Sequence, residues 1–133
     1  MKNIGAYQRS VYKKSLDLKD LGTAVAHYFS IDRSPIKNHP KSGLRNDIAR
    51  AIFIDASLLP SKVARISASA PKEVSFKHLR FIQTMTKNLW SYCNGLEHDG
   101  VEETEYIQLL KKEVNIFQDD FKRWKNALIN FKN

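Results

Sequence analysis

The stretch IQLLKKEVNIFQDDFKRWKNALINF, residues 107–131, decides the fold of this chain. Its large apolar side chains recur at alternating spacings of three and four residues, and they are Ile107, Leu110, Val114, Phe117, Phe121, Trp124, Leu128 and Phe131. This period places all of them on one stripe of an α-helix. A stripe of that length, rich in aromatic rings, predicts a long helix that packs against other helices.

Three further segments show the same helical period. Their apolar residues are Tyr7, Val11, Leu18, Leu21, Val25 and Tyr28 in the first, Leu44, Ile48, Ile52, Leu59, Val63 and Ile66 in the second, and Leu79, Ile82, Met85, Leu89, Tyr92 and Leu96 in the third. None of these segments has the sustained alternation of a β-strand. The breaks between the helical segments are expected at Ser30–Gly43, Ser67–Lys72 and Asn94–Gly100.

Four amphipathic helices joined by short loops favour an all-α fold, an antiparallel up-down-up-down four-helix bundle. The length of 133 residues suits one domain, so residues 1–133 are interpreted as a single domain. Pro60 lies inside the second segment and is expected to kink that helix near Leu58–Pro60, or to break it in two. Asp55 has two interpretations: a carboxylate at the core margin paired with a neighbouring Lys or Arg, or a subunit contact or functional carboxylate.

The positive charge of the chain is unevenly spread. The formal net charge is +8, from 22 Lys and Arg against 14 Asp and Glu. Residues 1–95 carry a net charge of +10, whereas residues 96–133 carry −2. A strongly basic part of a compact domain attracts polyanions, of which nucleic acid is the commonest in cells. The charge pattern therefore predicts a class of partner but no reaction.

The candidate nucleic-acid contacts are basic residues of the first two helical segments and of the loop between them, and many of them lie off the apolar stripes. They are Arg9, Lys13, Lys14, Lys37, Lys41, Arg45, Arg50, Lys62 and Arg65. Such contacts neutralise phosphates, so binding is expected to depend on salt and only weakly on sequence. Tyr12, Phe29 and Phe76 could stack on unpaired bases, but packing in the core or against another subunit is the favoured interpretation for each.

The sequence favours a protein that is not an enzyme and that needs no cofactor. It lacks a glycine-rich phosphate loop, a CxxC pair and an HExxH motif. No two of the histidines are four residues apart, so no metal site is expected on one helix face. The single cysteine, Cys93, is interpreted as a small core residue and fits a reducing, cytoplasmic setting. No apolar run approaches the roughly 18 residues of a membrane span, so no membrane partner is expected.

Residues 44–66, LRNDIARAIFIDASLLPSKVARI, resemble the second helix of a small four-helix-bundle family. That family includes proteins encoded in intervening sequences of 23S ribosomal RNA genes, and the accessory variability protein (Avd) of diversity-generating retroelements. Residues 76–82, FKHLRFI, are similar to the Avd segment that opens its third helix. The intervening-sequence branch usually has an acidic residue where this chain has Arg65, which favours the basic, Avd-like branch.

The resemblance implies a homo-oligomer, a pentameric ring, that binds RNA or DNA and associates with a reverse transcriptase. The protein would assist that enzyme in copying a template RNA into cDNA. One alternative is a structural or protein-interaction bundle of the intervening-sequence family with no direct nucleic-acid role. A further alternative is a ribonuclease, because Arg33 and His39 have the Arg-x5-His spacing that resembles the motif of HEPN domains. Pro35 and Pro40 make that stretch a loop rather than the helix such a site needs.

Overall fold

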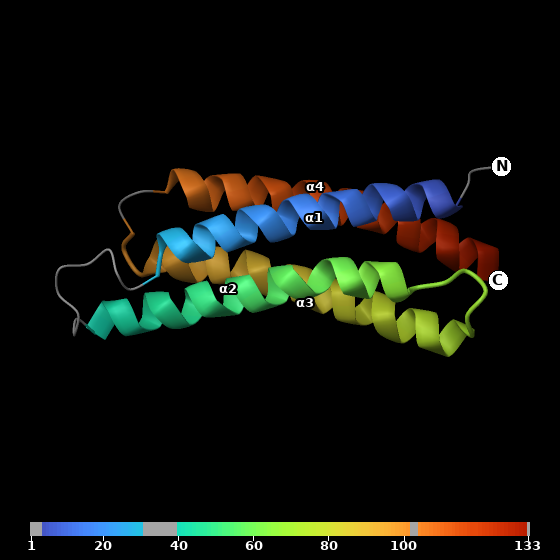
Figure 1. The fold of residues 1–133 in the computed structure, drawn as a ribbon, viewed down its shortest axis with the longest axis horizontal. Coiled ribbons are helices and arrows are strands. Elements are labelled where there is room, and N and C mark those ends of the chain that lie inside the picture. The colour runs from blue at the N-terminus through green and yellow to red at the C-terminus, as the bar shows by residue number, and fades with distance from the viewer. Residues whose placement is uncertain (1–3, 31–39, 102–103, 133) are drawn as a thin grey trace.

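The computed structural model describes residues 4–30, 40–101 and 104–132, and these fold into four long α-helices (Figure 1). The helices are α1 (Ile4–Tyr28), α2 (Pro40–Arg65), α3 (Lys72–His98) and α4 (Glu105–Lys132). The described residues contain no strand. The fold is an all-α four-helix bundle, as the periodicity predicts.

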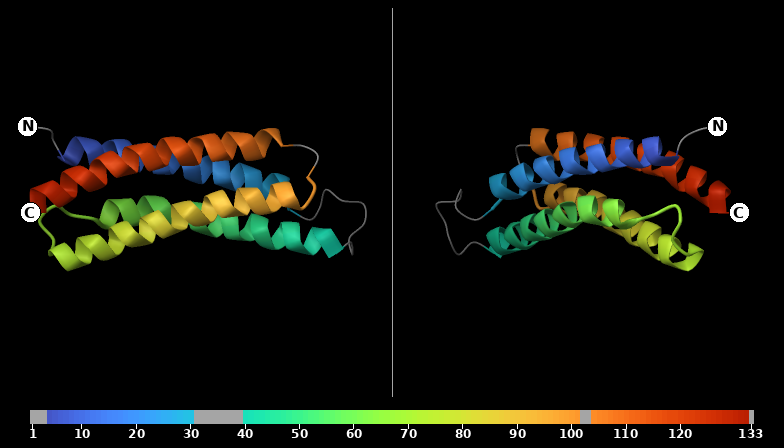
Figure 2. Two further views of the ribbon diagram at one scale, coloured as in Figure 1. Left: turned by 180° about the vertical axis from the view of Figure 1, so that it is seen from behind. Right: turned by 45° about the vertical axis from the view of Figure 1, so that its right-hand side comes forward.

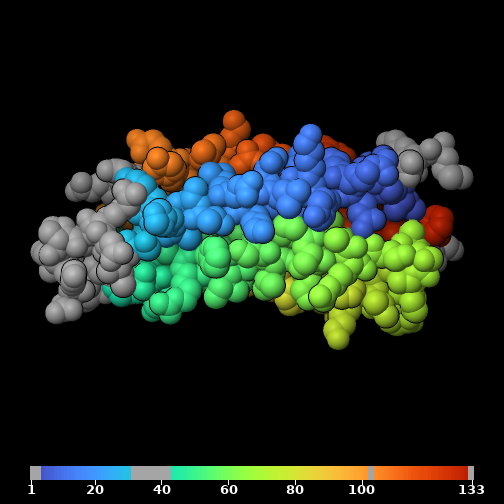
Figure 3. All heavy atoms as spheres, in the orientation of Figure 1, coloured from blue at the N-terminus to red at the C-terminus, as the bar shows by residue number. Residues whose placement is uncertain are grey.

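Consecutive helices run antiparallel and pack side by side. Helix α1 packs against α2 and α4, and α3 packs against the same two helices from the opposite corner. The start of α1 and the end of α4 consequently lie at the same end of the bundle (Figures 1 and 2). Figure 3 shows the face on which α1 and α2 lie together along most of their length.

One apolar core runs between the helices. The α4 stripe lies in this core from Ile107 to Leu128, and Trp124 is fully buried. Two predicted core residues are exceptions, since Phe131 is 61% exposed and Leu44 is 52% exposed. Both lie near an end of their helix, where no neighbouring helix extends far enough to cover the side chain.

Two glycines allow helices to approach closely. A Cβ atom on Gly22 of α1 would lie 2.7 Å from Cβ of Ala56 in α2. A Cβ atom on Gly95 of α3 would lie 3.2 Å from Cδ1 of Ile48. The predicted break at Asn94–Gly100 includes Gly95, but α3 continues through this glycine to His98. The turn follows at Gly100, whose φ of 78° lies in the left-handed region that favours glycine.

Pro60 does not divide α2. The helix continues past it to Arg65, so the alternative of two separate helices is excluded. Pro60 has no N–H for the carbonyl of Ala56, the residue four positions earlier. The buried proline lies only five residues before the helix ends. Little of the helix therefore follows the missing hydrogen bond. Within the described residues, none of the helices has the length and apolar character that crossing a membrane requires.

Candidate anion-binding surface

The antiparallel fold gathers the basic halves of all four helices at one end of the bundle. This basic end comprises residues 4–16, 56–65, 72–85 and 119–131. Those segments hold eleven Lys and Arg but only three acidic residues. The basic residues are Arg9, Lys13, Lys14, Lys62, Arg65, Lys72, Lys77, Arg80, Lys122, Arg123 and Lys125. The acidic residues are Glu73, Asp119 and Asp120.

The opposite end is nearly neutral. The remaining described helix positions, residues 17–28, 43–55, 86–98 and 105–118, hold six basic and seven acidic residues. Charge is therefore polarised along the long axis of the molecule. Helix α4 contributes to both ends. The net charges of residues 1–95 and 96–133 do not show this, because the second range includes all of α4. A concentration of one sign at one end raises the local potential and attracts polyanions.

The face formed by α1 and α2 is the most strongly basic part of that end. Residues 4–16 of α1 and 56–65 of α2 contain no acidic residue. Of the predicted contacts, Arg9, Lys13 and Arg65 are exposed here, and none of them forms an ion pair within the described residues. The structure therefore brings these three candidates to one end with their charged groups accessible.

Lys14 lies at the same end but is held by α4. Its Nζ atom lies 3.4 Å from Oδ2 of Asp120, which also accepts a hydrogen bond of 2.6 Å from Oγ of Ser10. Asp120 is only 7% exposed, so the contact between α1 and α4 needs these partners. Lys14 thus helps to neutralise a buried carboxylate, together with Arg123, whose Nη1 atom lies 3.6 Å from Oδ1 of Asp120.

Arg45 lies at the other end and joins the start of α2 to the end of α3. Its Nε atom donates a 2.6 Å hydrogen bond to Oδ2 of Asp99, and Nη2 donates to the Asp99 carbonyl oxygen at 3.2 Å. The Asp99 side chain is 5% exposed. Charge-assisted bonds of this kind are strong, so the guanidinium is engaged within the fold.

The other candidates are dispersed. Arg50 is exposed but lies fifteen residues before Arg65 on α2, which is about 22 Å along the helix axis. Lys62 faces α3, with Nζ 4.6 Å from the centre of the Phe81 ring. Lys37 lies outside the described residues, as do Arg33 and His39 of the ribonuclease hypothesis. Lys41 belongs to α2, but its side chain lies outside the described part of the structure.

The predicted contacts do not include the cations of α3 and α4 at the basic end. Lys77, Arg80 and Lys122 are exposed there. Lys125 donates a 3.1 Å hydrogen bond to Oε1 of Gln83. The signal was present in the sequence, because an antiparallel bundle places the last turns of α4 beside the first turns of α1 and α3. Adding charges by half-helix, rather than along the chain, would have revealed it.

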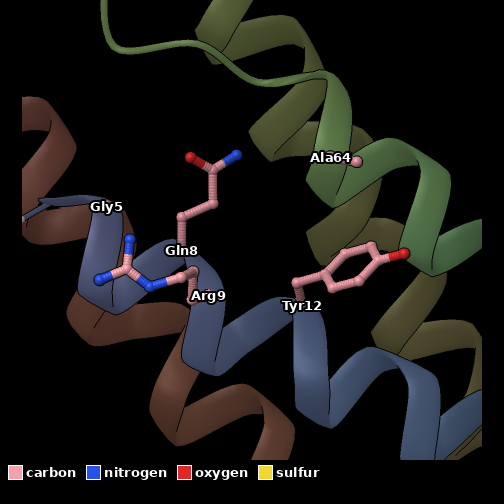
Figure 4. A pocket seen from close by; sticks show the side chains of 5 residues that line it. All are labelled: Gly5, Gln8, Arg9, Tyr12 and Ala64. Atoms are coloured by element: carbon pink, nitrogen blue, oxygen red, sulfur yellow. The ribbon is translucent and has the colours of Figure 1, made fainter.

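A hollow of about 350 Å³ opens between α1 and α2 at the basic end (Figure 4). It is lined by Gly5, Gln8, Arg9, Tyr12 and Ala64. The Tyr12 ring reaches from α1 towards α2, and the Arg9 guanidinium lies on the Gly5 side. A smaller hollow of about 180 Å³ lies between α3 and α4, and its lining residues include Phe76, Arg80 and Lys125.

Gln8 fixes the wall of the larger hollow. Its Nε2 atom donates to the carbonyl oxygens of Val63 and Ile66, at 2.9 and 2.7 Å. These carbonyls belong to the end of α2, where helical donors run out. The side-chain amide therefore caps α2 and reduces the negative potential of its last carbonyls beside Arg9.

Of the three proposed stacking residues, Tyr12 has the most accessible ring. Tyr12 is 38% exposed, whereas Phe29 is 8% exposed and packs edge-on against Tyr28. Phe76 is half-buried, and Nζ of Lys72 lies 5.4 Å from its ring centre. The packing alternative thus describes Phe29, while Tyr12 presents a ring beside exposed cations.

Cys93 is buried in the core, and Asp55 of α2 lies against α3. Burial raises the pKa of Cys93 to about 12, so the thiolate that a nucleophile needs is scarce. Asp55 is half-buried and accepts hydrogen bonds from Tyr92 and Asn88 of α3 rather than from a Lys or Arg, whereas its buried Oδ2 atom has no hydrogen-bond partner among the described residues. Burial raises the pKa of Asp55, and these two bonds partly oppose the rise. Asp55 therefore joins α2 to α3 without a charged partner.

Two of the histidines lie far apart in the fold. His27 lies near the end of α1 and His78 near the start of α3, which are opposite ends of the bundle (Figure 1). The structure does not bring these two side chains together. Within its described part, no cluster of three or more His, Cys, Asp or Glu is placed to hold a metal ion.

The uneven charge and the hollow are observed in this structure and do not depend on a comparison with another protein. No family model, curated protein or solved structure matches the chain. The resemblance to the Avd and intervening-sequence family therefore stays a prediction.

Proposed function

We propose that this protein is a non-enzymatic nucleic-acid-binding protein whose basic end carries the binding surface. The observation that carries the proposal is the excess of eleven basic over three acidic residues among the described helix positions of that end. Phosphates bound there release condensed counterions, which gives affinity without base recognition. Arg9, Lys13 and Arg65 are the proposed central contacts because they are exposed and free of the ion pairs that engage Lys14 and Arg45.

The family resemblance supplies the finer proposal. An Avd-like protein would assemble into a homo-oligomer in the cytoplasm and present RNA or DNA to a retroelement reverse transcriptase. A ring of subunits multiplies weak phosphate contacts, because each subunit contributes a basic end to the same polyanion. The nucleic acid would then be bound by several subunits at once.

One observation favours a second candidate function, that of a structural or protein-interaction bundle with no direct nucleic-acid role (the interaction bundle). Helix α2 exposes the apolar side chains of Phe53, Ile54 and Leu58, at 47%, 47% and 39%. Side chains of this size on an outer helix face suit a contact with another protein subunit. Phe53 and Ile54 belong to the nearly neutral end, so assembly there would leave the basic end accessible.

A matched pair of double variants tests the proposed function. Arg9→Gln/Lys13→Gln removes two charges from the basic end, and Lys87→Gln/Lys112→Gln removes two exposed charges from the other end. We expect the first variant to bind a labelled oligonucleotide more weakly. Because two phosphate contacts are lost, the plot of log affinity against log salt should flatten by about 1.4 for a single strand.

The second variant controls for net charge, since both have the same formal charge. Circular dichroism verifies that each stays folded. Equal weakening by the two variants would show that overall charge, not the basic end, governs binding. Absence of binding by the wild-type protein at low salt would leave the interaction bundle as the better description.

A further inference from the structure

The hollow between α1 and α2 has features that attraction of phosphates alone does not require. Its lining includes an exposed aromatic residue, Tyr12, whose ring extends towards α2, and an exposed arginine, Arg9, whose guanidinium lies on the Gly5 side (Figure 4). Its volume of about 350 Å³ falls in the range of roughly 300–1,000 Å³ typical of sites for small organic groups. Gly5 and Ala64 line it with little or no side chain, which leaves the space in front of the ring open.

We propose that this hollow receives an unpaired base of a single-stranded nucleic acid, with the base stacked on Tyr12 and the adjoining phosphate on Arg9. The inference rests on the proposed function and specifies its substrate class. Aromatic side chains stack on any base because every base has a π-face. A base in a duplex is already stacked on its neighbours and cannot enter a hollow without being extruded, which costs free energy.

The electrostatics of the hollow suit such a ligand. None of its lining residues is acidic, and Lys13 lies exposed one residue beyond Tyr12. The hollow lies at the first turns of α1, the end of a helix that favours negative charge. The end of α2 would repel a phosphate, but Gln8 donates hydrogen bonds to two of its carbonyls, those of Val63 and Ile66. Attraction to the phosphate therefore dominates at the mouth.

Two substitutions separate stacking from charge without changing a basic residue. Tyr12→Leu keeps apolar bulk but removes the ring, and Ala64→Leu fills the hollow from an exposed position on α2. Tyr12→Phe retains the ring and should behave as the wild-type protein does. Leu16→Ala is the control, because Leu16 lies one turn along α1 and is similarly exposed, at 37% against 38% for Tyr12.

Fluorescence anisotropy at one fixed salt concentration compares a labelled single strand with the duplex of the same sequence. We expect Tyr12→Leu to weaken single-strand binding by about 5- to 150-fold, and Ala64→Leu to weaken it as well. Duplex binding should change little in either variant. A strand carrying 2-aminopurine should lose fluorescence on binding to the wild-type protein and to Tyr12→Phe, but not to Tyr12→Leu.

The outcomes separate this inference from the proposed function. Unchanged single-strand affinity in both Tyr12→Leu and Ala64→Leu would overturn the base site, while salt-dependent binding that still needs Arg9 and Lys13 would keep the basic end intact. A wild-type protein that binds neither strand form at low salt would overturn both. Equal losses in Leu16→Ala and Tyr12→Leu would show that the α1 surface, rather than the ring, matters.

Discussion

At the scale of single residues, a Cβ atom added at Gly22 and one added at Gly43 are expected to change stability in opposite directions. A Cβ on Gly22 would lie 2.7 Å from Cβ of Ala56, and neither carbon can rotate away. A Cβ on Gly43 would meet nothing within 4 Å. The sequence does not distinguish these glycines, because the contact of Gly22 lies on another helix.

The first prediction concerns this pair. Gly22→Ala should lower the free energy of unfolding, because overpacking costs about 1–3 kcal/mol while the gain in helix propensity is only about 1 kcal/mol. Gly43→Ala should raise it by about 0.5–1 kcal/mol, since only backbone entropy changes. Urea unfolding followed by circular dichroism measures both. Equal stabilisation by the two substitutions would contradict the close approach of α1 and α2.

The second prediction concerns Asp55. Folding raises the pKa of this carboxyl above its ordinary value of 3.8, chiefly through burial. The stability it contributes is therefore present below pH 3.8 and lost as pH rises through the raised pKa. Asp55→Asn should be more stable than the wild-type protein at neutral pH, and the difference should shrink as the pH falls towards 3.8.

Unfolding midpoints measured across acidic to neutral pH test this. Asp47→Asn serves as the control because Asp47 is exposed on the same helix. If Asp55→Asn were the less stable protein at neutral pH, the ionised carboxylate would be favourable in the fold. That result would revive the hypothesis of a functional carboxylate.

At the scale of elements, α2 forms side-chain hydrogen bonds with neighbouring segments at both of its ends. Gln8 of α1 donates to the carbonyls of Val63 and Ile66 at the end of the helix. Near its start, Arg45 bonds to Asp99 beyond the end of α3. These bonds fix how far α2 can slide along the bundle. Periodicity predicts the helix but not its longitudinal position, because the partners lie tens of residues away in sequence.

The third prediction compares Arg45 with Arg50. Arg45→Ala should destabilise the fold by about 1–3 kcal/mol, because it leaves the buried Asp99 carboxylate without its charged partner. Arg50→Ala should stay within about 0.5 kcal/mol of the wild-type protein, since Arg50 is exposed. Chemical unfolding gives both values. A neutral Arg45→Ala would mean that this ion pair contributes nothing to the fold.

At the scale of the whole molecule, two kinds of surface are separated along the bundle axis. The described basic end holds the excess of positive charge, so copies of the protein repel each other there. The exposed Phe53 and Ile54 lie at the nearly neutral end, where that repulsion is weaker. This separation favours assembly through α2 with the basic ends left accessible.

The fourth prediction tests assembly. Phe53→Ser/Ile54→Ser should shift the protein from oligomer to monomer in light scattering, because burying the exposed half of each side chain contributes about 1 kcal/mol. Leu109→Ser is the control, since Leu109 is 45% exposed on α4. Both variants should keep the helical content of the wild-type protein. A wild-type protein that is monomeric at high concentration would contradict a homo-oligomer.

Much of the fold follows from local periodicity, whereas the candidate site does not. The α4 stripe alone requires a long helix with partners, and its residues from Ile107 to Leu128 are buried as predicted. Gly95 was misread because a glycine inside a helix and a glycine in a loop look alike in sequence. Lys14 and Arg45 look like free surface cations until Asp120 and Asp99 are placed beside them.

Spacing and composition are enough to predict four amphipathic helices, their approximate limits and an excess of positive charge. The place where that charge gathers depends on how the helices pack. Antiparallel packing places the starts of α1 and α3 beside the ends of α2 and α4, so short basic segments far apart in the chain combine at one end. The hollow beside Tyr12 arises in the same way, since its walls come from residues of two helices.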